Sequence, residues 1–416
     1  MTDDAKILHD LFDAALRAAL PDGKFDGRLP PQPKGRTIVL GAGKASARMA
    51  AAFEDAWVKA GGTCEGLVVT RYGHAVSTRS IEIVEAAHPV PDEAGLNAAR
   101  RILALAKEAG PHDLIICLIS GGASALLSLP AEGITLEDKQ ALNRALLKSG
   151  APIGEMNLVR KALSAIKGGR LAEAAYPAQI VTYLISDVPG DDPGSIGSGP
   201  TIPERVDPDV VEAILGKYGI DVPAHVMQAV RANAVEPTGA GGVVHMLATP
   251  KMALDAAAAR AREAGLIPLI LGDAIEGEAR EVGRVMAGIA RSVRLHGEPV
   301  GVPCVLLSGG ETTVTLRGSG RGGRNAEFLL SLALALRGEA RLSAIACDTD
   351  GIDGSEDNAG AWFDQTLFAD ARGRGVNLAS HLAGNDAYSA FAQLDRLVIT
   401  GPTLTNVNDF RAILIR

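Results

Sequence analysis

Short apolar runs alternate with alanine-rich stretches along most of this chain, and this alternation constrains the fold more than any other feature. Many runs, such as Leu114 to Ile119, are apolar at every position, as expected of strands whose two faces are covered by helices. The alternation therefore predicts an α/β fold with helical layers over sheets. The expected strands are 37–41, 66–70, 80–85, 113–119, 179–185, 243–248, 267–272, 303–308, 312–316, 342–347 and 396–400.

The chain is long enough for more than one domain. An amphipathic helix is predicted over residues 4–20, where Leu8, Leu11 and Phe12 share one face. Much later, the Gly- and Pro-containing stretch from Glu236 to Gly242 interrupts two periodic regions. We therefore expect two domains, residues 1–235 and 236–416.

Charge and composition exclude several classes of function. The net charge is −8 and no dense basic patch is present, so we expect no nucleic-acid partner. The longest apolar runs are strand-sized, far below the roughly 20 residues of a membrane span, and the first residues are acidic, unlike a signal peptide. The four cysteines form no CxxC pair. The chain is expected to be a reduced, cytoplasmic protein with no membrane partner.

Glycine is abundant, with 48 residues, and it gathers directly after apolar runs. Gly41 and Gly43 follow the first expected strand and precede Lys44 and a helical run. A strand, glycine turn and helix expose backbone N–H groups to an anion, and a lysine adds a full charge. The spacing matches neither a P-loop nor GxGxxG, because Ser46 stands where the third glycine belongs. An anion site and a plain tight turn both remain open.

Two further segments could hold a small anionic ligand. Ser120, Gly121, Gly122 and Ser124 follow the expected strand 113–119, at the strand end where open α/β sheets bind ligands. The segment 154–170 is expected to be a helix, and polar side chains share one of its faces. A polyanion site and an ordinary solvated face are both compatible with that pattern. The residues of this face are Asn157, Arg160, Lys161, Ser164 and Lys167.

Carboxylates and one arginine complete the set of candidate residues. Asp187 follows the expected strand 179–185, where it could act as a base, bind Mg²⁺ or belong to a loop. Arg324 begins a leucine-rich helix, against the preference of the helix dipole, which suggests a nearby anion. The segment from Asp348 to Gly354 departs from a calcium loop, so Asp350 is either an Mg²⁺ contact or part of a carboxylate-rich loop. Glycine turns, dispersed cations and carboxylates together are typical of phosphoryl transfer.

In their order along the chain, these motifs resemble those of the class II glycerate 2-kinases. The resemblance covers roughly residues 8 to 412, and departures include Ala162, where members often have His, and Leu404, where they often have Gly. The matching motifs are GAGKAS at 41–46, HPVPDE at 88–93, LISGGASALL at 118–127, NLVRKALSAIKGGRLA at 157–172, ISDVPGDDPGSIGSGPT at 185–201, LSGGETTV at 307–314, GGRNAEFLLSLAL at 322–334, DTDGIDG at 348–354 and GPTLTNVNDF at 401–410.

The resemblance implies ATP-dependent phosphorylation of D-glycerate at its 2-hydroxyl, with Mg²⁺. It also implies a Rossmann-like α/β/α N-terminal domain and a smaller MOFRL-type α/β C-terminal domain, with the active site in the cleft between them. Lys44 and Arg324 would stabilise the transferred phosphoryl group, and Asp187 would be the base or orienting carboxylate. The other expected site residues are Ser120, Gly121, Gly122, Ser124, Asn157, Arg160, Lys161 and Lys167 for glycerate, Gly41, Gly43, Gly309, Gly310, Glu311 and Asn325 for ATP, and Asp187, Glu311 and Asp350 for Mg²⁺.

Two functions other than a kinase are compatible with parts of the sequence. A hydroxypyruvate reductase would need GxGxxG followed about 20 residues later by an acid; Glu65 is suitably spaced, but the third glycine is missing. A non-catalytic sensor of nucleotides or sugar phosphates would bind without turnover. The sequence leaves a homodimer open.

Overall fold

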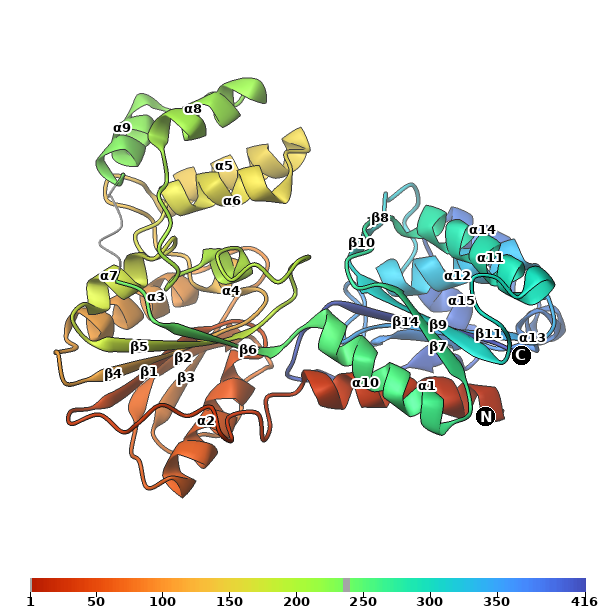
Figure 1. The fold of residues 1–416 in the computed structure, drawn as a ribbon. Coiled ribbons are helices and arrows are strands. Elements are labelled where there is room, and N and C mark those ends of the chain that lie inside the picture. The colour runs from red at the N-terminus through yellow and green to blue at the C-terminus, as the bar shows by residue number, and fades with distance from the viewer. Residues whose placement is uncertain (1, 235–239) are drawn as a thin grey trace. The chain divides into compact units, whose positions relative to one another are not determined.

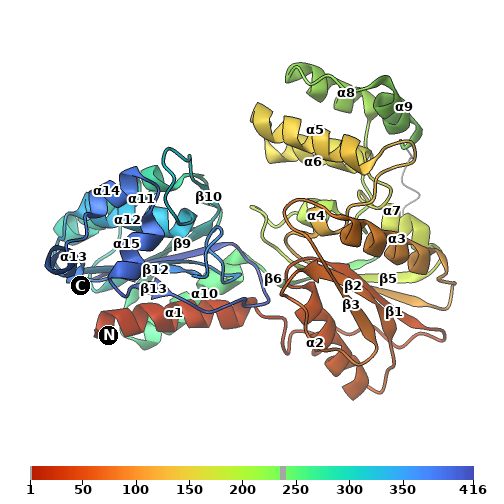
Figure 2. The same ribbon diagram turned by 180° about the vertical axis from the view of Figure 1, so that it is seen from behind.

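The computed structural model describes residues 2–234 and 240–416 (Figures 1 and 2). They divide into a first unit, residues 21–247, and a second unit, which joins the residues up to 20 with residues 248–416. The predicted boundary between residues 235 and 236 lies outside the described residues. Each unit is built around its own six-stranded sheet.

The sheet of the first unit has the strand order β3-β2-β1-β4-β5-β6. The pairs β3/β2, β2/β1, β1/β4 and β4/β5 are parallel, and this order is that of a Rossmann-like sheet, so the predicted α/β class is confirmed. Every residue of the central strands β1 and β4 is buried, as their uninterrupted apolar sequences predict. The strands are β1 (Thr37–Ala42), β2 (Glu65–Arg71), β3 (Ile81–Ala86), β4 (Leu114–Ile119), β5 (Gln179–Ile185) and β6 (Val243–Ala248).

Helices cover both faces of this sheet, and four more form a layer of their own. Figure 1 shows α2 on one face and α3, α4 and α7 on the other, with α5, α6, α8 and α9 stacked beyond them. The outer layer has a separate apolar core that includes Leu142, Leu146, Val159 and Val211. The helices are α2 (Ser46–Lys59), α3 (Glu93–Lys107), α4 (Ala123–Leu126), α5 (Leu136–Ser149), α6 (Ile153–Ala162), α7 (Arg170–Ala175), α8 (Pro208–Lys217) and α9 (Ala224–Ala232), with a 3₁₀ turn at Ile196–Ser198.

The sheet of the second unit is mixed, in the order β13-β12-β11-β14-β9-β7. β7/β9 is parallel, whereas β9/β14, β14/β11, β11/β12 and β12/β13 are antiparallel. A separate two-stranded pair joins β8 to β10. The strands are β7 (Ile267–Gly272), β8 (Gly277–Glu278), β9 (Cys304–Gly310), β10 (Thr312–Thr313), β11 (Leu342–Asp348), β12 (Gly360–Phe363), β13 (Leu397–Val398) and β14 (Asp409–Ile415).

The N-terminal helix α1 (Asp3–Ala19) belongs to the second unit, whereas the sequence placed these residues with the first domain. Its apolar face packs on that unit, where the ring of Phe12 lies 5.7 Å from that of Phe410, and Asp10 pairs with Arg260 at 2.7 Å. Helical periodicity predicts that a face is buried but not which surface covers it. The other helices are α10 (Pro250–Glu263), α11 (Ala279–His296), α12 (Arg324–Leu336), α13 (Leu367–Arg374), α14 (Leu378–Ala383) and α15 (Ala387–Gln393).

Three strands of the second unit, β8, β12 and β14, were not expected, and two expected strands, those over 312–316 and 396–400, are shorter than predicted. β14 lies at the centre of the sheet with all seven residues buried, but its sequence contains Asp409 and Arg411, which break the apolar run. β12 is only Gly360–Phe363, and the strand expected over 312–316 is reduced to β10. Because of its buried charged residues, β14, which carries part of the candidate site, could not be identified from apolar runs.

Two simpler expectations can be compared with the fold. No helix within residues 2–234 and 240–416 is both long and apolar enough to cross a membrane. Cys117, Cys304 and Cys347 are buried free thiols, and Cys64 is a partly buried free thiol.

Candidate active site

In the first unit, two glycine-containing turns lie side by side at the carboxyl ends of β1 and β4. The Lys44 amide donates to the Gly121 carbonyl at 2.9 Å, and the Ala45 amide donates to the Ser120 hydroxyl at 3.0 Å. Gly43 has φ +135°, and a Cβ at this position would clash with Ser120. The turns are thus packed tightly together, which explains why glycine is needed there.

Ser120, which was predicted to bind substrate, takes part in this packing. Its side chain is fully buried, and its amide donates to the Ala42 carbonyl at 3.1 Å. Its hydroxyl accepts from the Ala45 amide and lies 3.3 Å from the Ser46 hydroxyl. Ser120 therefore positions the Lys44 turn, and its contact with substrate stays a prediction.

Gly122 brings together two side chains that the sequence reading did not connect. It adopts φ +81°, and a Cβ there would lie 3.2 Å from the His88 ring and 3.2 Å from Cγ of Lys44. His88 belongs to the HPVPDE motif, which was noticed without a role being given to its histidine. His88 is thus an additional candidate beside Lys44.

The cationic segment after residue 154 differs from the single helix that was predicted. α6 ends at Ala162, so Ser164 and Lys167 lie beyond it. Lys161 and Lys167 are nonetheless only 4% and 1% exposed, which rules out an ordinary solvated face. The residues after the helix pair instead with the segment that follows α4, where the Ala165 amide donates to the Leu129 carbonyl at 3.0 Å.

Each predicted substrate residue of this segment has an identifiable partner. The Arg160 guanidinium donates to Asn143 at 2.9 Å and to Asn157 at 3.3 Å. Lys161 pairs with Glu204, and Lys167 donates to the Ser124 carbonyl, while the Ser124 hydroxyl lies 2.8 Å from that of Ser198. Of these three basic side chains, only Lys161 is paired with a carboxylate among the described residues, so Arg160 and Lys167 have no acidic partner there.

Asp187 lies two residues beyond β5. Because β5 pairs in parallel with β4, and β4 with β1, the ends of these strands meet at one edge of the sheet. Asp187 is partly exposed there. The strand order therefore brings Asp187 to the same edge as the 41–46 and 120–124 turns.

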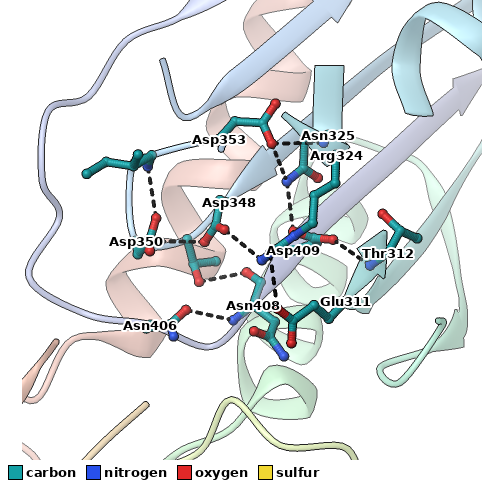
Figure 3. Close-up of polar contacts among 12 residues, drawn as sticks. Glu311, Thr312, Arg324, Asn325, Asp348, Asp350, Asp353, Asn406, Asn408 and Asp409 are labelled. Atoms are coloured by element: carbon teal, nitrogen blue, oxygen red, sulfur yellow. Dashed lines mark hydrogen bonds and ion pairs between the residues drawn. The ribbon is translucent and has the colours of Figure 1, made fainter. Parts of the chain in front are cut away.

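In the second unit, Arg324 is held by three carboxylates (Figure 3). Its guanidinium donates to Asp409 at 2.8 Å, to Asp348 at 2.8 Å and to Glu311 at 3.1 Å. These acids lie at the ends of neighbouring strands, with Asp348 paired in register with Asp409. Burial lowers the pKa of Arg324, but the three carboxylates outweigh it and raise this pKa above its ordinary value. Arg324 is thus permanently charged.

This arrangement changes the interpretation of Arg324. An arginine at a helix start suggested a bound anion, yet the compensating anions are carboxylates of the protein itself. Arg411 is a second arginine beside these acids and pairs with Asp409. The acids in this cluster nevertheless outnumber the two arginines. The acids around Arg324 that Figure 3 draws are Glu311, Asp348, Asp350, Asp353 and Asp409.

Asp353 joins the start of α12 to this cluster. Its two carboxylate oxygens accept from the Asn325 amide at 2.9 Å and the Ala326 amide at 2.8 Å. Burial raises the pKa of Asp353 to about 6, although these two hydrogen bonds favour the carboxylate. The Asn325 side chain donates to Asp409 at 2.7 Å. Asn325 is therefore part of the cluster, while Asp353, Asp348 and Asp409 were not predicted as site residues.

Asp353→Ala is expected to destabilise the second unit by about 2–4 kcal/mol, because two buried N–H groups at a helix start lose their acceptors. In the folded protein the pKa of Asp353 is about 6, above its ordinary value. The contribution of Asp353 to the unfolding free energy is therefore complete below about pH 4 and decreases as the pH rises through 6. The destabilisation should thus be about 1 kcal/mol smaller at pH 7 than at pH 5. Urea unfolding at both pH values measures it.

The control for this prediction is Asp255→Ala, which removes an exposed carboxylate from α10 of the same unit. It should change the unfolding free energy by less than about 0.5 kcal/mol at either pH. Equal destabilisation by the two substitutions would show that Asp353 does not cap α12.

The remaining residues predicted to bind the nucleotide or the metal are Gly309, Gly310 and Asp350. The Gly309 carbonyl accepts from Ile275 at 3.2 Å, and a Cβ at Gly310 would clash with Ile275, so this Ser-Gly-Gly turn is closely packed. Asp350 is buried and accepts from the Ile352 amide at 2.9 Å. Among residues 2–234 and 240–416, no three His, Cys, Asp or Glu side chains are grouped as metal ligands.

One departure from the resembled family has a visible effect on the backbone. Leu404, where glycine is frequent, adopts φ +63°, in the left-handed region that favours glycine. Leu404 thus adopts a backbone conformation that a glycine would adopt without strain. Ala162 is the last residue of α6 and is buried, so no imidazole is present at that position.

Comparisons with known proteins agree with this architecture. Residues 7–231 match a family described as "Domain of unknown function (DUF4147)", and residues 304–409 match the MOFRL family. A D-glycerate 2-kinase of Thermotoga maritima is 39% identical over 97% of this chain and 96% of its own length. A crystal structure of glycerate kinase from that organism covers 99% of both chains with a TM-score of 0.89.

A protein of Agrobacterium vitis, which carries the provisional name hydroxypyruvate reductase, is 55% identical over 99% of this chain and 94% of its own length. The full-length likeness to the Thermotoga kinase in sequence and fold, together with the two family matches, decides the classification. The chain belongs to the class II glycerate kinase family.

Proposed function

We propose that the protein transfers the γ-phosphoryl group of ATP to the 2-hydroxyl of D-glycerate, giving 2-phospho-D-glycerate and ADP. The observation that carries this proposal is the end-to-end likeness to the D-glycerate 2-kinase of Thermotoga maritima. The glycine turns and cations described above are the kind of groups that phosphoryl transfer requires, because this chemistry depends on positioning and charge stabilisation.

In the first unit, Lys44 is assigned to the transferred phosphoryl group, with Gly41 and Gly43 permitting close approach of the backbone. Asp187 is assigned to the 2-hydroxyl of glycerate, as the base or the group that orients the oxygen for attack. Its place at the same sheet edge as Lys44 supports this pairing. Glycerate itself is assigned to Gly121, Gly122, Ser124, Asn157, Arg160, Lys161 and Lys167.

In the second unit, Arg324 is assigned to the phosphates of ATP. Its side chain is 24% exposed, and three carboxylates hold the guanidinium. A guanidinium fixed in this way needs little reorganisation when negative charge develops on a phosphoryl oxygen. Gly309, Gly310, Glu311 and Asn325 are assigned to the same nucleotide.

Mg²⁺ is assigned to the reaction as the companion of ATP. Protein sites for this ion usually supply only one or two carboxylates and leave the other positions to phosphates and water. The surplus of acids around Arg324 fits that requirement, and Glu311 is half exposed. Bound Mg²⁺ would neutralise phosphate charge, with Glu311, Asp350 and Asp187 as the proposed carboxylates.

The provisional name of the Agrobacterium relative supports a second candidate, NAD(P)H-dependent reduction of hydroxypyruvate. The turn after β1 argues against a dinucleotide, because Ser46 replaces the third glycine of GxGxxG. One pair of assays separates the two reactions. ADP release is measured with D-glycerate, ATP and Mg²⁺, and NADH or NADPH oxidation is measured with hydroxypyruvate.

The kinase proposal expects ADP release that depends on D-glycerate and no oxidation of either nicotinamide cofactor. Oxidation with hydroxypyruvate, without ADP release from glycerate, would replace the kinase by the reductase. Tight ATP binding with no turnover in either assay would instead indicate a non-catalytic binding protein.

A further inference from the structure

The first unit contains a pocket of about 300 Å³ that is rich in cations. Its walls come from residues 88–91, from the 122–128 segment after β4, from α5, and from residues 160–167. The charged or ionisable side chains that line it are His88, Lys139, Arg144, Arg160 and Lys167, and no described Asp or Glu lines it. A pocket with this charge pattern is suited to an anion.

Lys139 is the most informative of these side chains. It is only 8% exposed, and its Nζ is buried without a hydrogen-bond partner in the part of the chain that the structure describes. Burial, and secondly the charge of Arg160, lower the pKa of Lys139 to about 7. A buried ammonium without a partner is strongly unfavourable, so its position in the wall of a pocket calls for a ligand that can accept from it.

The neighbouring side chains of Arg160 and Lys167 provide no negative charge for the ammonium group of Lys139. Arg160 donates to the neutral side chains of Asn143 and Asn157, and Lys167 donates to the carbonyl of Ser124. Burial, followed by repulsion from Lys139 and other nearby cations, lowers the pKa of Lys167 well below its ordinary value. The three groups therefore repel one another, and a shared anion would relieve that repulsion.

The pocket adjoins the turn that carries Lys44. Gly122 lines the pocket, and a Cβ on Gly122 would lie 3.2 Å from Cγ of Lys44. The volume is at the low end of the range for small-molecule sites, which suits a three-carbon acid or one phosphate group better than a whole nucleoside triphosphate. An anion fixed in the pocket would thus have its other end close to Lys44.

We propose that this pocket binds an oxyanion of a substrate, a carboxylate or a phosphate, and that Lys139 is a ligand-binding residue together with Arg160 and Lys167. The inference rests on the proposed function for the identity of the substrates and extends it with a residue and a pocket. The carboxylate of D-glycerate and the phosphate of a phosphorylated ligand share this chemistry, and the experiment separates them.

The test uses isothermal titration calorimetry on the full chain and on Lys139→Met, with D-glycerate and inorganic phosphate as separate ligands. Methionine retains the length of the side chain, lacks the charge and suits a buried position. The matched control is Lys148→Met, which removes an exposed lysine from the same helix, α5. We expect Lys139→Met to weaken binding of at least one ligand tenfold or more and Lys148→Met to leave both unchanged.

A second readout in the same titrations is proton uptake. At pH 8 much of Lys139 is neutral in the empty pocket, and a bound anion would restore its proton. Arg144, Arg160, Lys167 and His88 face the same pocket, so uptake is read as the difference between the full chain and Lys139→Met. Titrations in two buffers of different ionisation enthalpy measure the number of protons taken up on binding. We expect this number to fall in Lys139→Met but not in Lys148→Met.

Loss of glycerate binding alone would identify a carboxylate site, and loss of phosphate binding alone would identify a phosphate site. Unchanged affinity for both ligands in a folded Lys139→Met protein would overturn the proposal, as would failure of the natural chain to bind either. Thermal unfolding checks the fold, and Lys139→Gln replaces Lys139→Met if the latter is unfolded. If binding depends on Lys139 but no ADP is formed, the kinase assignment fails while the pocket stands.

Discussion

Lys44→Ala is expected to lower kcat for D-glycerate phosphorylation about 10³-fold, because it removes a full charge from the proposed path of the phosphoryl group. The hydrogen bonds of the Lys44 and Ala45 backbone amides, which join the two turns, remain in this variant, so the turn should keep its place. The measurement is initial-rate kinetics at saturating ATP and D-glycerate, with thermal unfolding alongside.

The matched control for Lys44 is Lys59→Ala, which removes an exposed lysine from the end of α2, the helix that follows the same turn. It should retain the kcat of the natural chain. Lys44→Arg, which keeps the charge but changes the donor geometry, should fall between the two. A kcat for Lys44→Ala within threefold of the natural value would remove Lys44 from the mechanism.

Arg324→Ala is expected to abolish measurable turnover and to destabilise the second unit by about 3–5 kcal/mol. The substitution leaves Asp348 and Asp409, whose side chains are 5% and 0% exposed, without their shared cation. Kinetics and urea unfolding measure the two effects. Arg372→Ala, at an exposed arginine of α13, should affect neither.

A double substitution separates the structural role of Arg324 from its proposed role in catalysis. Arg324→Ala with Asp348→Asn removes one buried carboxylate together with the cation and leaves the Arg411–Asp409 pair in place, so part of the lost stability should return. Turnover should stay absent, because the proposed phosphate-binding guanidinium is still missing. Recovery of activity together with stability would mean that Arg324 acts only on the fold.

Much of the fold could be predicted from the sequence, because an uninterrupted run of apolar residues indicates a strand that is buried on both faces. β1, β4 and β5 were expected nearly at their observed bounds, and their parallel order follows from the alternation with helices. β14 was missed for a physical reason: Asp409 and Arg411 are buried within it and compensate each other, so a strand at the centre of the sheet does not look apolar.

Less of the candidate site could be predicted, since charge compensation joins residues far apart in the chain. Arg324 was singled out correctly as unusual, but its partners Asp348 and Asp409 follow 24 and 85 residues later. Lys139 gave no local signal, because its burial depends on the packing of α5 against residues outside that helix. The motifs HPVPDE and GPTLTNVNDF contained the signal for His88 and Asp409, but not their roles.

The identity of the product tests phosphorylation at the 2-hydroxyl. D-glycerate, ATP and Mg²⁺ are incubated with the full chain, and the product is examined by ³¹P-coupled ¹H NMR against authentic 2- and 3-phosphoglycerate. We expect phosphorus coupling to the single proton on C2, the signature of 2-phospho-D-glycerate. Coupling to the two protons on C3, or the absence of any phosphorylated product, would contradict it.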